Sequence, residues 1–459
     1  MEYQDKTFYK VVRKDLTLNT DPLEFKCEQG ESYFTDATHL GRFYAHGDLV
    51  AQITIPEDAQ VYKDPCGYKW KADRFIIERF ESIESYWSDQ IFCLDAVKHN
   101  GNALKHVKNQ SREICMEAVK QNGRLLFYVK EQFSELCLEA VKQNGRALRY
   151  VNVKSRELCL EAVRQNGLAL QYVNVQTREL CLEAVKQNGH ALQFMNVQTR
   201  ELCSEAVRQN GLALQYVTSK SDELCLKAVK QNGLALQYVN VQTCELCLEA
   251  VIQNGLALQY VILKSDELYL EAVRQNGLAL QYVDVQTSEL CLEAVRQNGL
   301  ALYFVDIQTP EICLEAVRQS GGALHYVKNQ SSELCLEAVK NAGFALRHVN
   351  IKTHELCLEA VKQNGFALEH VEKEDRTHEL CLEAVKQNPM ALEYVKEQSH
   401  EICLEAVKRD GMALEYVKEQ SHEICLDSVR QNINALAFVK EQFKELCLDS
   451  VKQNHICIY

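Results

Sequence analysis

The chain has 459 residues, of which 46% are apolar, and its net charge at neutral pH is −13. The apolar share is ordinary for a folded protein, and the acidic balance disfavours a nucleic-acid partner, whose phosphates need a basic surface. The sequence has no run of about 18 apolar residues that would span a membrane, and Met1–Thr7 lack the apolar stretch of a secretory signal. With 20 cysteines and no such signal, we expect a reducing, cytoplasmic location.

Residues 1–90 are predicted to form a small α+β module. The segments Tyr9–Arg13, Asp48–Pro56 and Lys69–Ile77 have the composition of strands, Thr35–Ala45 that of a short capped helix, and Asp64–Gly67 that of a turn. We expect this module to cover the first apolar face of the array that follows. Its predicted core is aromatic, with Phe8, Tyr33, Phe34, Phe43, Trp70 and Phe75 as members.

This module also holds the side chains that an enzyme would use. They are Asp36, His39, His46, Asp48 and Asp73. No glycine-rich phosphate loop, nucleophile elbow or metal-ligand spacing connects them. The sequence therefore predicts no catalytic residue and no cofactor, and the alternative is an enzyme whose chemistry lies in residues 1–90 with the array as a docking arm.

From residue 91 onward the chain repeats one motif every 22 residues, and a single cysteine position marks the period. A fixed period in this range is typical of a solenoid. We therefore predict a mostly α protein, an α-solenoid of about 17 two-helix repeats over residues 91–459. The repeat positions are Cys93, Cys115, Cys137, Cys159, Cys181, Cys203, Cys225, Cys247, Tyr269, Cys291, Cys313, Cys335, Cys357, Cys381, Cys403, Cys425 and Cys447.

Each copy is predicted to contain two short helices. Leu158–Val163 places its apolar side chains on one wide arc of a helix, and the stretch that begins at Leu168 does the same. Gly167 between them is expected to end the first helix in a left-handed conformation. Pro310 and Pro389 each follow a capping residue, which suits the first position of a helix. The alternative, a leucine-rich-type repeat with strands, fails on strict alternation.

The cysteine column can be interpreted as a metal array, a redox ladder or simple packing. Equivalent helices lie about 8–10 Å apart, which is too far for a disulfide or for converging zinc ligands. We therefore predict buried packing residues and no metal. The single CxxC, Cys244 to Cys247, is weak evidence for redox chemistry. The histidines that share one position are expected to line an edge that could respond to pH; they are His354, His378, His400 and His422.

One position of the second helix varies along the array, and its variation is typical of a surface that selects partners. It begins as glutamine, passes through aromatic and basic side chains, and ends as glutamate. We predict that this stripe binds protein partners, although a solvated face drifting without function would show the same pattern. Its members are Gln171, Gln193, Gln215, Gln237, Gln259, Gln281, Tyr303, His325, Arg347, Glu369, Glu393 and Glu415.

The repeated unit, written Glu-Leu-Cys-Leu-Glu-Ala-Val-Lys-Gln-Asn-Gly, resembles a helical repeat family of unknown function that is abundant in giant viruses of amoebae. The opening module, with Glu31–Asp36, Gly47–Pro56 and Lys69–Arg74, resembles a leader that mimivirus-like viruses place before ankyrin arrays. The resemblance implies a viral protein of the host cytoplasm, assigns no catalytic residue, and leaves packaging in the virion open. The chain departs from the repeat pattern in its insertion around Glu372–Arg376 and in replacing the repeat glycine with Pro389 and Ile433.

The apolar stretch His455–Tyr459 follows one helix of the last unit, where arrays usually carry a polar cap. We therefore expect residues 445–459 to mediate self-association. The sequence as a whole predicts a non-catalytic scaffold that binds protein partners along the stripe.

Overall fold

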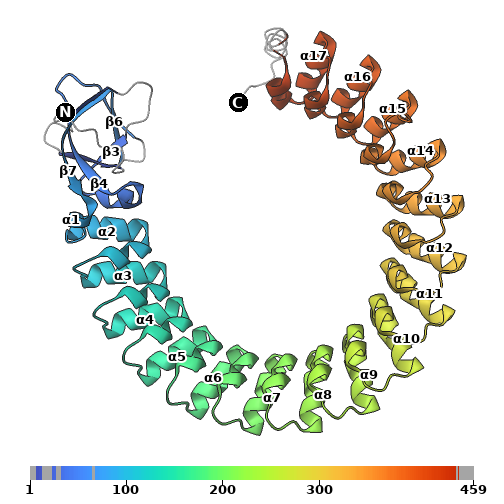
Figure 1. Ribbon diagram of the computed structural model, residues 1–459, viewed down its shortest axis with the longest axis horizontal. Helices are drawn as coiled ribbons and strands as arrows, with labels where there is room; N and C mark the ends of the chain where they lie inside the picture. The colour runs from blue at the N-terminus through green and yellow to red at the C-terminus, as the bar shows by residue number, and fades with distance from the viewer. Residues whose placement is uncertain (1–6, 13–22, 27–32, 65–67, 441–442, 444–459) are drawn as a thin grey trace. The chain divides into compact units, whose positions relative to one another are not determined.

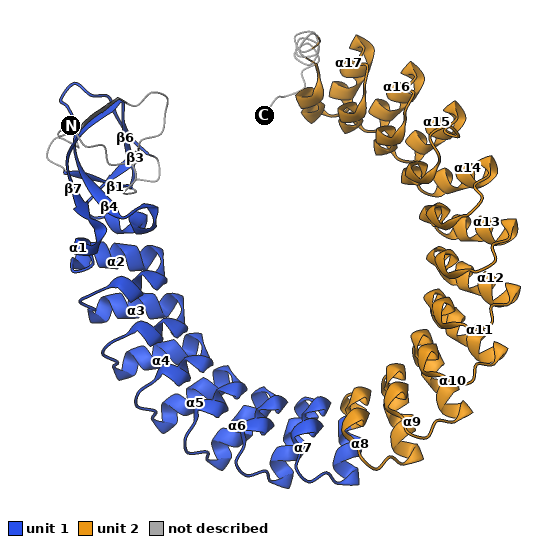
Figure 2. Cartoon of the chain, viewed as in Figure 1, with its two compact units in different colours: residues 1–228 blue, residues 229–459 orange. Residues whose placement is uncertain are grey.

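The computed structural model describes residues 7–12, 23–26, 33–64, 68–440 and 443. The chain forms two compact units, residues 1–228 and 229–459, and the division falls within one helix of the repeat array (Figure 2). The expected boundary at residue 90 stays a prediction; the last strand ends at Ser82 and the first repeat helix begins at Gln90.

The first unit opens with an antiparallel seven-stranded sheet of order β2-β7-β4-β1-β3-β6-β5. Its core joins side chains that are distant in sequence: Phe8 packs edge-on against Phe34 and Trp70, with ring centroids 5.0 and 5.5 Å apart, and Phe75 joins the same cluster. The strands are β1 (Phe8–Val12), β2 (Leu23–Lys26), β3 (Tyr33–Asp36), β4 (Leu49–Thr54), β5 (Val61–Lys63), β6 (Trp70–Ala72) and β7 (Arg74–Ser82).

Several predictions for this region need correction. The expected strand over Lys69–Ile77 is two strands, because the chain turns at Asp73, whose backbone N–H and carboxylate both bond to Gln60. The expected helix Thr35–Ala45 begins as the end of β3 and becomes the 3-10 helix η2 (Leu40–His46). Phe43, predicted as a core residue, is only half-buried. The side chain of Tyr33 and most of the predicted turn at Asp64–Gly67 lie outside the described residues.

Helix η2 covers the first repeat, as expected of the opening module. The backbone N–H of Arg42 donates to Asp95 Oδ2 at 2.8 Å, and Arg42 Nε donates to Oδ1 at 3.0 Å. A Cβ on Gly41 would lie 2.2 Å from the carbonyl oxygen of Phe92, so only glycine permits this approach. The Asn100 side-chain amide donates to the Tyr44 hydroxyl at 3.0 Å.

The predicted helical array is confirmed, and within each unit the α-helices stack in one row with shorter helices in a second row beside them (Figure 1). After α1 (Ile83–Tyr86) the α-helices have ten residues each. They are α2 (Gln90–His99), α3 (Arg112–Gln121), α4 (Ser134–Gln143), α5 (Arg156–Gln165), α6 (Arg178–Gln187), α7 (Arg200–Gln209), α8 (Asp222–Gln231), α9 (Cys244–Gln253), α10 (Asp266–Gln275), α11 (Ser288–Gln297), α12 (Pro310–Gln319), α13 (Ser332–Asn341), α14 (His354–Gln363), α15 (His378–Gln387), α16 (His400–Arg409) and α17 (His422–Gln431).

The second helix of each repeat is a six-residue 3-10 helix. These helices are η3 (Gly101–His106), η4 (Gly123–Tyr128), η5 (Gly145–Tyr150), η6 (Gly167–Tyr172), η7 (Gly189–Phe194), η8 (Gly211–Tyr216), η9 (Gly233–Tyr238), η10 (Gly255–Tyr260), η11 (Gly277–Tyr282), η12 (Gly299–Phe304), η13 (Gly321–Tyr326), η14 (Gly343–His348), η15 (Gly365–His370), η16 (Pro389–Tyr394), η17 (Gly411–Tyr416) and η18 (Ile433–Phe438). Runs of this tighter helix longer than about four residues are uncommon, so each of these helices is long for its type.

The repeat glycine has a different reason from the one expected. Gly277 is the first residue of η11 and has no left-handed backbone; Asn276 before it is extended, at φ −152°. A Cβ on Gly277 would lie 2.3 Å from the carbonyl oxygen of Ala294 in the next repeat. Glycine is therefore required because two backbones approach closely, and not because a helix ends there.

The recurring Gln-Asn pair connects each repeat to its neighbour. Asn276 Oδ1 accepts from the N–H of Leu278 and caps the 3-10 helix. Gln297 Oε1 accepts from the N–H of Gly277 at 2.6 Å. At η16 both partners change together: Pro389 has no N–H to donate, and Arg409 stands where the accepting glutamine would be.

The two prolines confirm the predicted helix starts. Pro310 is the first residue of α12 after the cap Thr309, and Pro389 is the first residue of η16 after the cap Asn388. Both caps accept a backbone N–H two or three residues later. The expectation of self-association through residues 445–459 lies outside the described residues.

Candidate functional site

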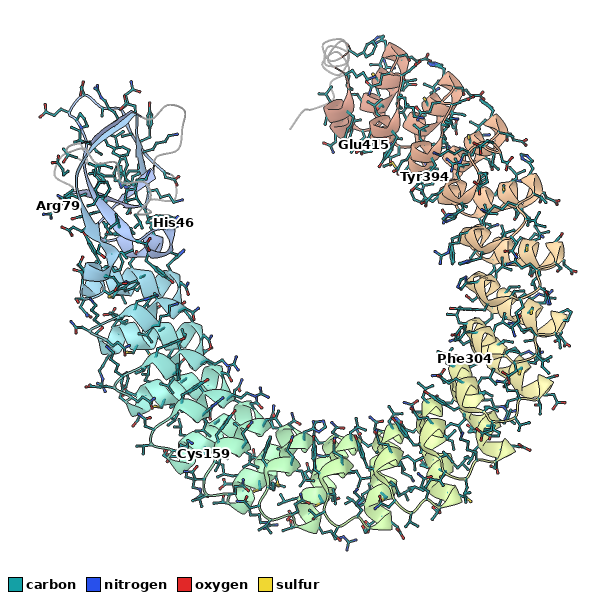
Figure 3. All side chains as sticks on the ribbon, in the orientation of Figure 1. His46, Arg79, Cys159, Phe304, Tyr394 and Glu415 are labelled. Atoms are coloured by element: carbon teal, nitrogen blue, oxygen red, sulfur yellow. The ribbon has the colours of Figure 1, made fainter. Side chains whose placement is uncertain are left out.

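The predicted stripe occupies the fifth position of successive 3-10 helices, from η6 to η17, and all twelve of its side chains are exposed. The alanine and leucine at the third and fourth positions, such as Ala279 and Leu280, are completely buried and fix the orientation of each helix. Within the second unit, Phe304, Tyr394 and Glu415 lie along one edge of the stack, on the row of 3-10 helices (Figure 3). Whether the stripe binds a partner stays a prediction.

The six glutamines of the stripe each bond to their own helix. Gln171 Nε2 donates to the carbonyl of Leu168 at 2.9 Å, and Gln281 Nε2 donates to that of Leu278 at 3.0 Å. The same bond recurs at Gln193, Gln215, Gln237 and Gln259. An amide has two N–H donors and one acceptor oxygen, so this bond uses a single donor and orders the side chain before any partner arrives.

The middle of the stripe contains aromatic and basic groups in contact. The Tyr303 ring lies 5.1 Å from that of Tyr326 in the next repeat. His325 Nδ1 and His348 Nδ1 are 3.1 Å apart, and Arg347 Nε donates to His348 Nε2 at 2.8 Å. Burial, helped by the charge of Arg347, lowers the pKa of His348 below its usual value. A neutral His348 therefore carries its proton on Nδ1 and donates it to His325.

The last part of the stripe is acidic. Burial and the carboxylate of Glu369 raise the pKa of Tyr394, while Glu415 and burial raise the pKa of Tyr416. These carboxylates therefore lie beside partly exposed phenol rings. The stripe changes along the chain from neutral amides through an aromatic and basic segment to an acidic one.

A second exposed row lies at the first position of the α-helices, and it is joined by ion pairs from one repeat to the next. Arg156 pairs with Glu179, Arg178 with Glu201 and Arg200 with Glu223. Histidines take over this pattern in the second unit: His354, His378 and His400 lie 3.8, 3.6 and 3.1 Å from Glu379, Glu401 and Glu423. Exposed pairs contribute little to stability singly, and here each one joins residues of two neighbouring repeats.

The repeat array matches a known protein family. The model of a family described as "Domain of unknown function (DUF4116)" matches thirteen segments between residues 89 and 444, each about two repeats long and most of them overlapping the next. The chain belongs to this family. No curated protein matches it.

The cysteines of the DUF4116 repeats are packing residues. The repeat-position cysteines from Cys93 to Cys403 are buried and form no disulfide, and burial raises the pKa of the Cys159 thiol and of the others in that range. Several donate to a connector glutamine, as Cys291 Sγ does to Gln286 Oε1 at 3.4 Å. Cys244 is exposed, and within the described part of the chain no cluster of three or more His, Cys, Asp or Glu side chains is arranged to hold a metal ion.

In the sheet region, the structure brings together only two of the five side chains weighed for catalysis. His39 Nδ1 lies 2.8 Å from Asp36 Oδ1, which also accepts from the backbone N–H and the hydroxyl of Thr38. This is the hydrogen bonding of a turn. His46 lies apart, on a cavity of about 210 Å³ beside Lys10 and Lys69.

Sequence reasoning missed the connectors before the α-helices of the DUF4116 repeats. A glutamine there spans two repeats: Gln286 Nε2 donates to the carbonyl of Phe304 at 2.8 Å, and its Oε1 accepts from the N–H of Asp306 at 3.1 Å. The residue before it is aliphatic and exposed in many repeats, as at Val285. The signal was available, because a valine or isoleucine occupies this position in several repeats, among them Val153, Val285 and Ile351.

Among the described residues, no helix combines the length and the apolar character needed to cross a membrane.

Proposed function

We propose that the chain is a non-catalytic scaffold that binds protein partners along the stripe of its 3-10 helices. The observation that supports this is the coexistence of an invariant buried frame with a variable exposed row. Alanine and leucine are buried in every 3-10 helix from η5 to η17, while the fifth position changes from Gln171 to Tyr303 to Glu415. Side chains that vary on a rigid, regularly spaced frame suit recognition of an elongated partner surface.

The proposal includes the absence of catalysis and the place of action. In the described sheet region, Thr38 and Asp36 both meet the same ring nitrogen of His39, so the histidine cannot relay a proton from one to the other. We further propose a viral protein that acts in the cytoplasm of an infected amoeba, with the opening module as a leader. This part rests on the resemblance of the repeats and of the opening module alone.

Affinity capture from amoebal lysate, quantified by mass spectrometry, tests the scaffold. The variant Gln215→Glu/Gln237→Glu/Gln259→Glu changes three neighbouring amides to carboxylates without altering their size. We expect it to lose most captured proteins. The matched control Arg164→Gln/Lys186→Gln/Arg274→Gln changes charge on exposed α-helix positions and should retain them. Equal capture by wild type and both variants would remove the stripe from the proposal, and substrate turnover by the full chain would overturn the non-catalytic assignment.

A further inference from the structure

The connectors of four consecutive repeats in the second unit expose a row of aliphatic side chains, which we name the aliphatic ridge. Its members are Val241, Ile262, Leu263, Val285 and Ile307, exposed by 77, 67, 85, 73 and 80%. Single exposed aliphatic residues need no explanation. Four of them share one position in successive repeats, and Ile262 lies directly before Leu263, so together they form a row of apolar groups of the kind that marks an interaction site.

The fold does not require aliphatic side chains in the ridge. Ser219 and Asn329 occupy the same repeat position, are also exposed, and are followed by the ten-residue helices α8 and α13. Glu397 and Glu419 occupy it in later repeats, before α16 and α17. The apolar character is therefore not a packing need of the repeat.

The ridge is also held rigidly. Gln242, directly after Val241, donates to the carbonyl of Tyr260 at 2.8 Å and accepts from the N–H of Ile262 at 3.0 Å. Lys264, directly after Leu263, donates to the carbonyl of Tyr282 at 2.9 Å. Most members are β-branched, with few rotamers. Covering such side chains therefore loses little conformational entropy.

We propose that the aliphatic ridge is a self-association surface, occupied by the same ridge of a second copy of this chain. The partner must present apolar groups at the spacing of one repeat, and a second copy does so without adjustment. Polar residues bound the four repeats on both sides, at Ser219 and Asn329. An antiparallel, two-fold arrangement therefore places the aliphatic side chains of one ridge against those of the other along the whole ridge. Two-fold dimers are the commonest oligomers.

Area and charge fit this occupant. Covering an aliphatic side chain of this size removes roughly 100 Å² from water, so the ridge supplies roughly 500 Å² on each chain. A standard interface covers about 800 Å² on each partner, of which about two-thirds is apolar in homodimers. Beside the ridge, the Asp284 carboxylate is paired with Lys264 Nζ at 3.1 Å and accepts from the Tyr269 hydroxyl at 2.9 Å. Its charge is therefore compensated where two copies would meet.

Sedimentation velocity of the full chain across the micromolar range tests the proposal. Wild type should form a reversible dimer. The variant Val241→Ser/Leu263→Ser/Val285→Ser/Ile307→Asn uses residue types already present at this position, so it should keep its circular dichroism spectrum and dissociate about 100-fold more readily or worse. The control Ile252→Lys/Leu300→Arg removes two exposed apolar side chains outside the ridge and the stripe and should dimerise like wild type.

A photo-crosslinking amino acid at position 263 identifies the occupant. Crosslinks between two copies within residues 241–307 support the proposal. A monomeric wild type, an unchanged dimer of the ridge variant, or crosslinks to any other segment or to another protein would overturn it. The capture experiment on the stripe is independent, so failure of one proposal does not imply failure of the other.

Discussion

In the sheet region, residues far apart in the sequence meet in one aromatic core, whereas in the repeats each buried side chain meets its neighbours about one repeat away. Phe8, Phe34 and Trp70 come from three strands and pack on one another. Gly277 and Ala294 belong to successive repeats, and the same close approach recurs along the array. A sheet of this kind gains stability only when it is complete, while a repeat array gains it unit by unit. The two regions should therefore respond differently to damage.

The largest effect is expected from Phe8→Ala. Removing a fully buried aromatic ring leaves a cavity in the only core the sheet has among its described residues, at a cost of about 3–5 kcal/mol. The contribution of Trp70 to the near-ultraviolet circular dichroism should change strongly, while the helical far-ultraviolet signal should persist. A parallel loss of helical signal would show that the repeats depend on the sheet, and would break the comparison.

Within the repeats, two adjacent glycines give a matched pair. A Cβ on Gly321 would lie 2.5 Å from the carbonyl oxygen of Ala338, whereas one on Gly322 would meet nothing closer than the Phe344 ring at 3.7 Å. We expect Gly321→Ala to destabilise the protein by about 2 kcal/mol and Gly322→Ala to change stability by less than about 0.5 kcal/mol. Urea unfolding followed by circular dichroism measures both. Equal losses of stability would show that the close backbone contact between repeats is not the reason for glycine at position 321.

A smaller loss is expected from Gln297→Ala. It removes the acceptor for the N–H of Gly277 and should cost about 1 kcal/mol. The neighbouring Arg296→Ala breaks only an exposed pair with Glu315, at 3.5 Å, and should cost less than about 0.5 kcal/mol. Both variants are compared by the same urea titration. If Arg296→Ala lowered the free energy of unfolding more than Gln297→Ala, surface charge, and not the glutamine bond to the next repeat, would be holding the repeats together.

The smallest structural effect is expected at the thiols. Burial raises the pKa of Cys247, so less reactive thiolate is present at any pH near neutrality, whereas Cys244 is exposed. Titration with a thiol reagent at pH 8 should show one fast-reacting group fewer in Cys244→Ser, and no change in the fast phase in Cys247→Ser. Rapid reaction of the buried column would mean that the repeats open far more readily than their packing implies.

The sequence by itself determined the period, the helical character of each repeat and the burial of the cysteines, because these follow from side-chain patterns read locally. Pro310 and Pro389 even marked the helix starts. The strands were harder: Lys69–Ile77 read as one strand and is two, since the turn at Asp73 depends on bonds to Gln60.

Only the tertiary structure decided that the second helix is 3-10 and that Gly277 must be glycine because the backbone of Ala294 in the next repeat approaches it closely. A six-residue stretch buries the same side chains in either kind of helix, so its pattern cannot distinguish them. Stacking of two repeats gives the glycine, the capping asparagine and the bridging glutamine their roles. Stacking also leaves the aliphatic ridge exposed. Those roles depend on distances between neighbouring repeats, and the sequence of a single repeat does not contain these distances.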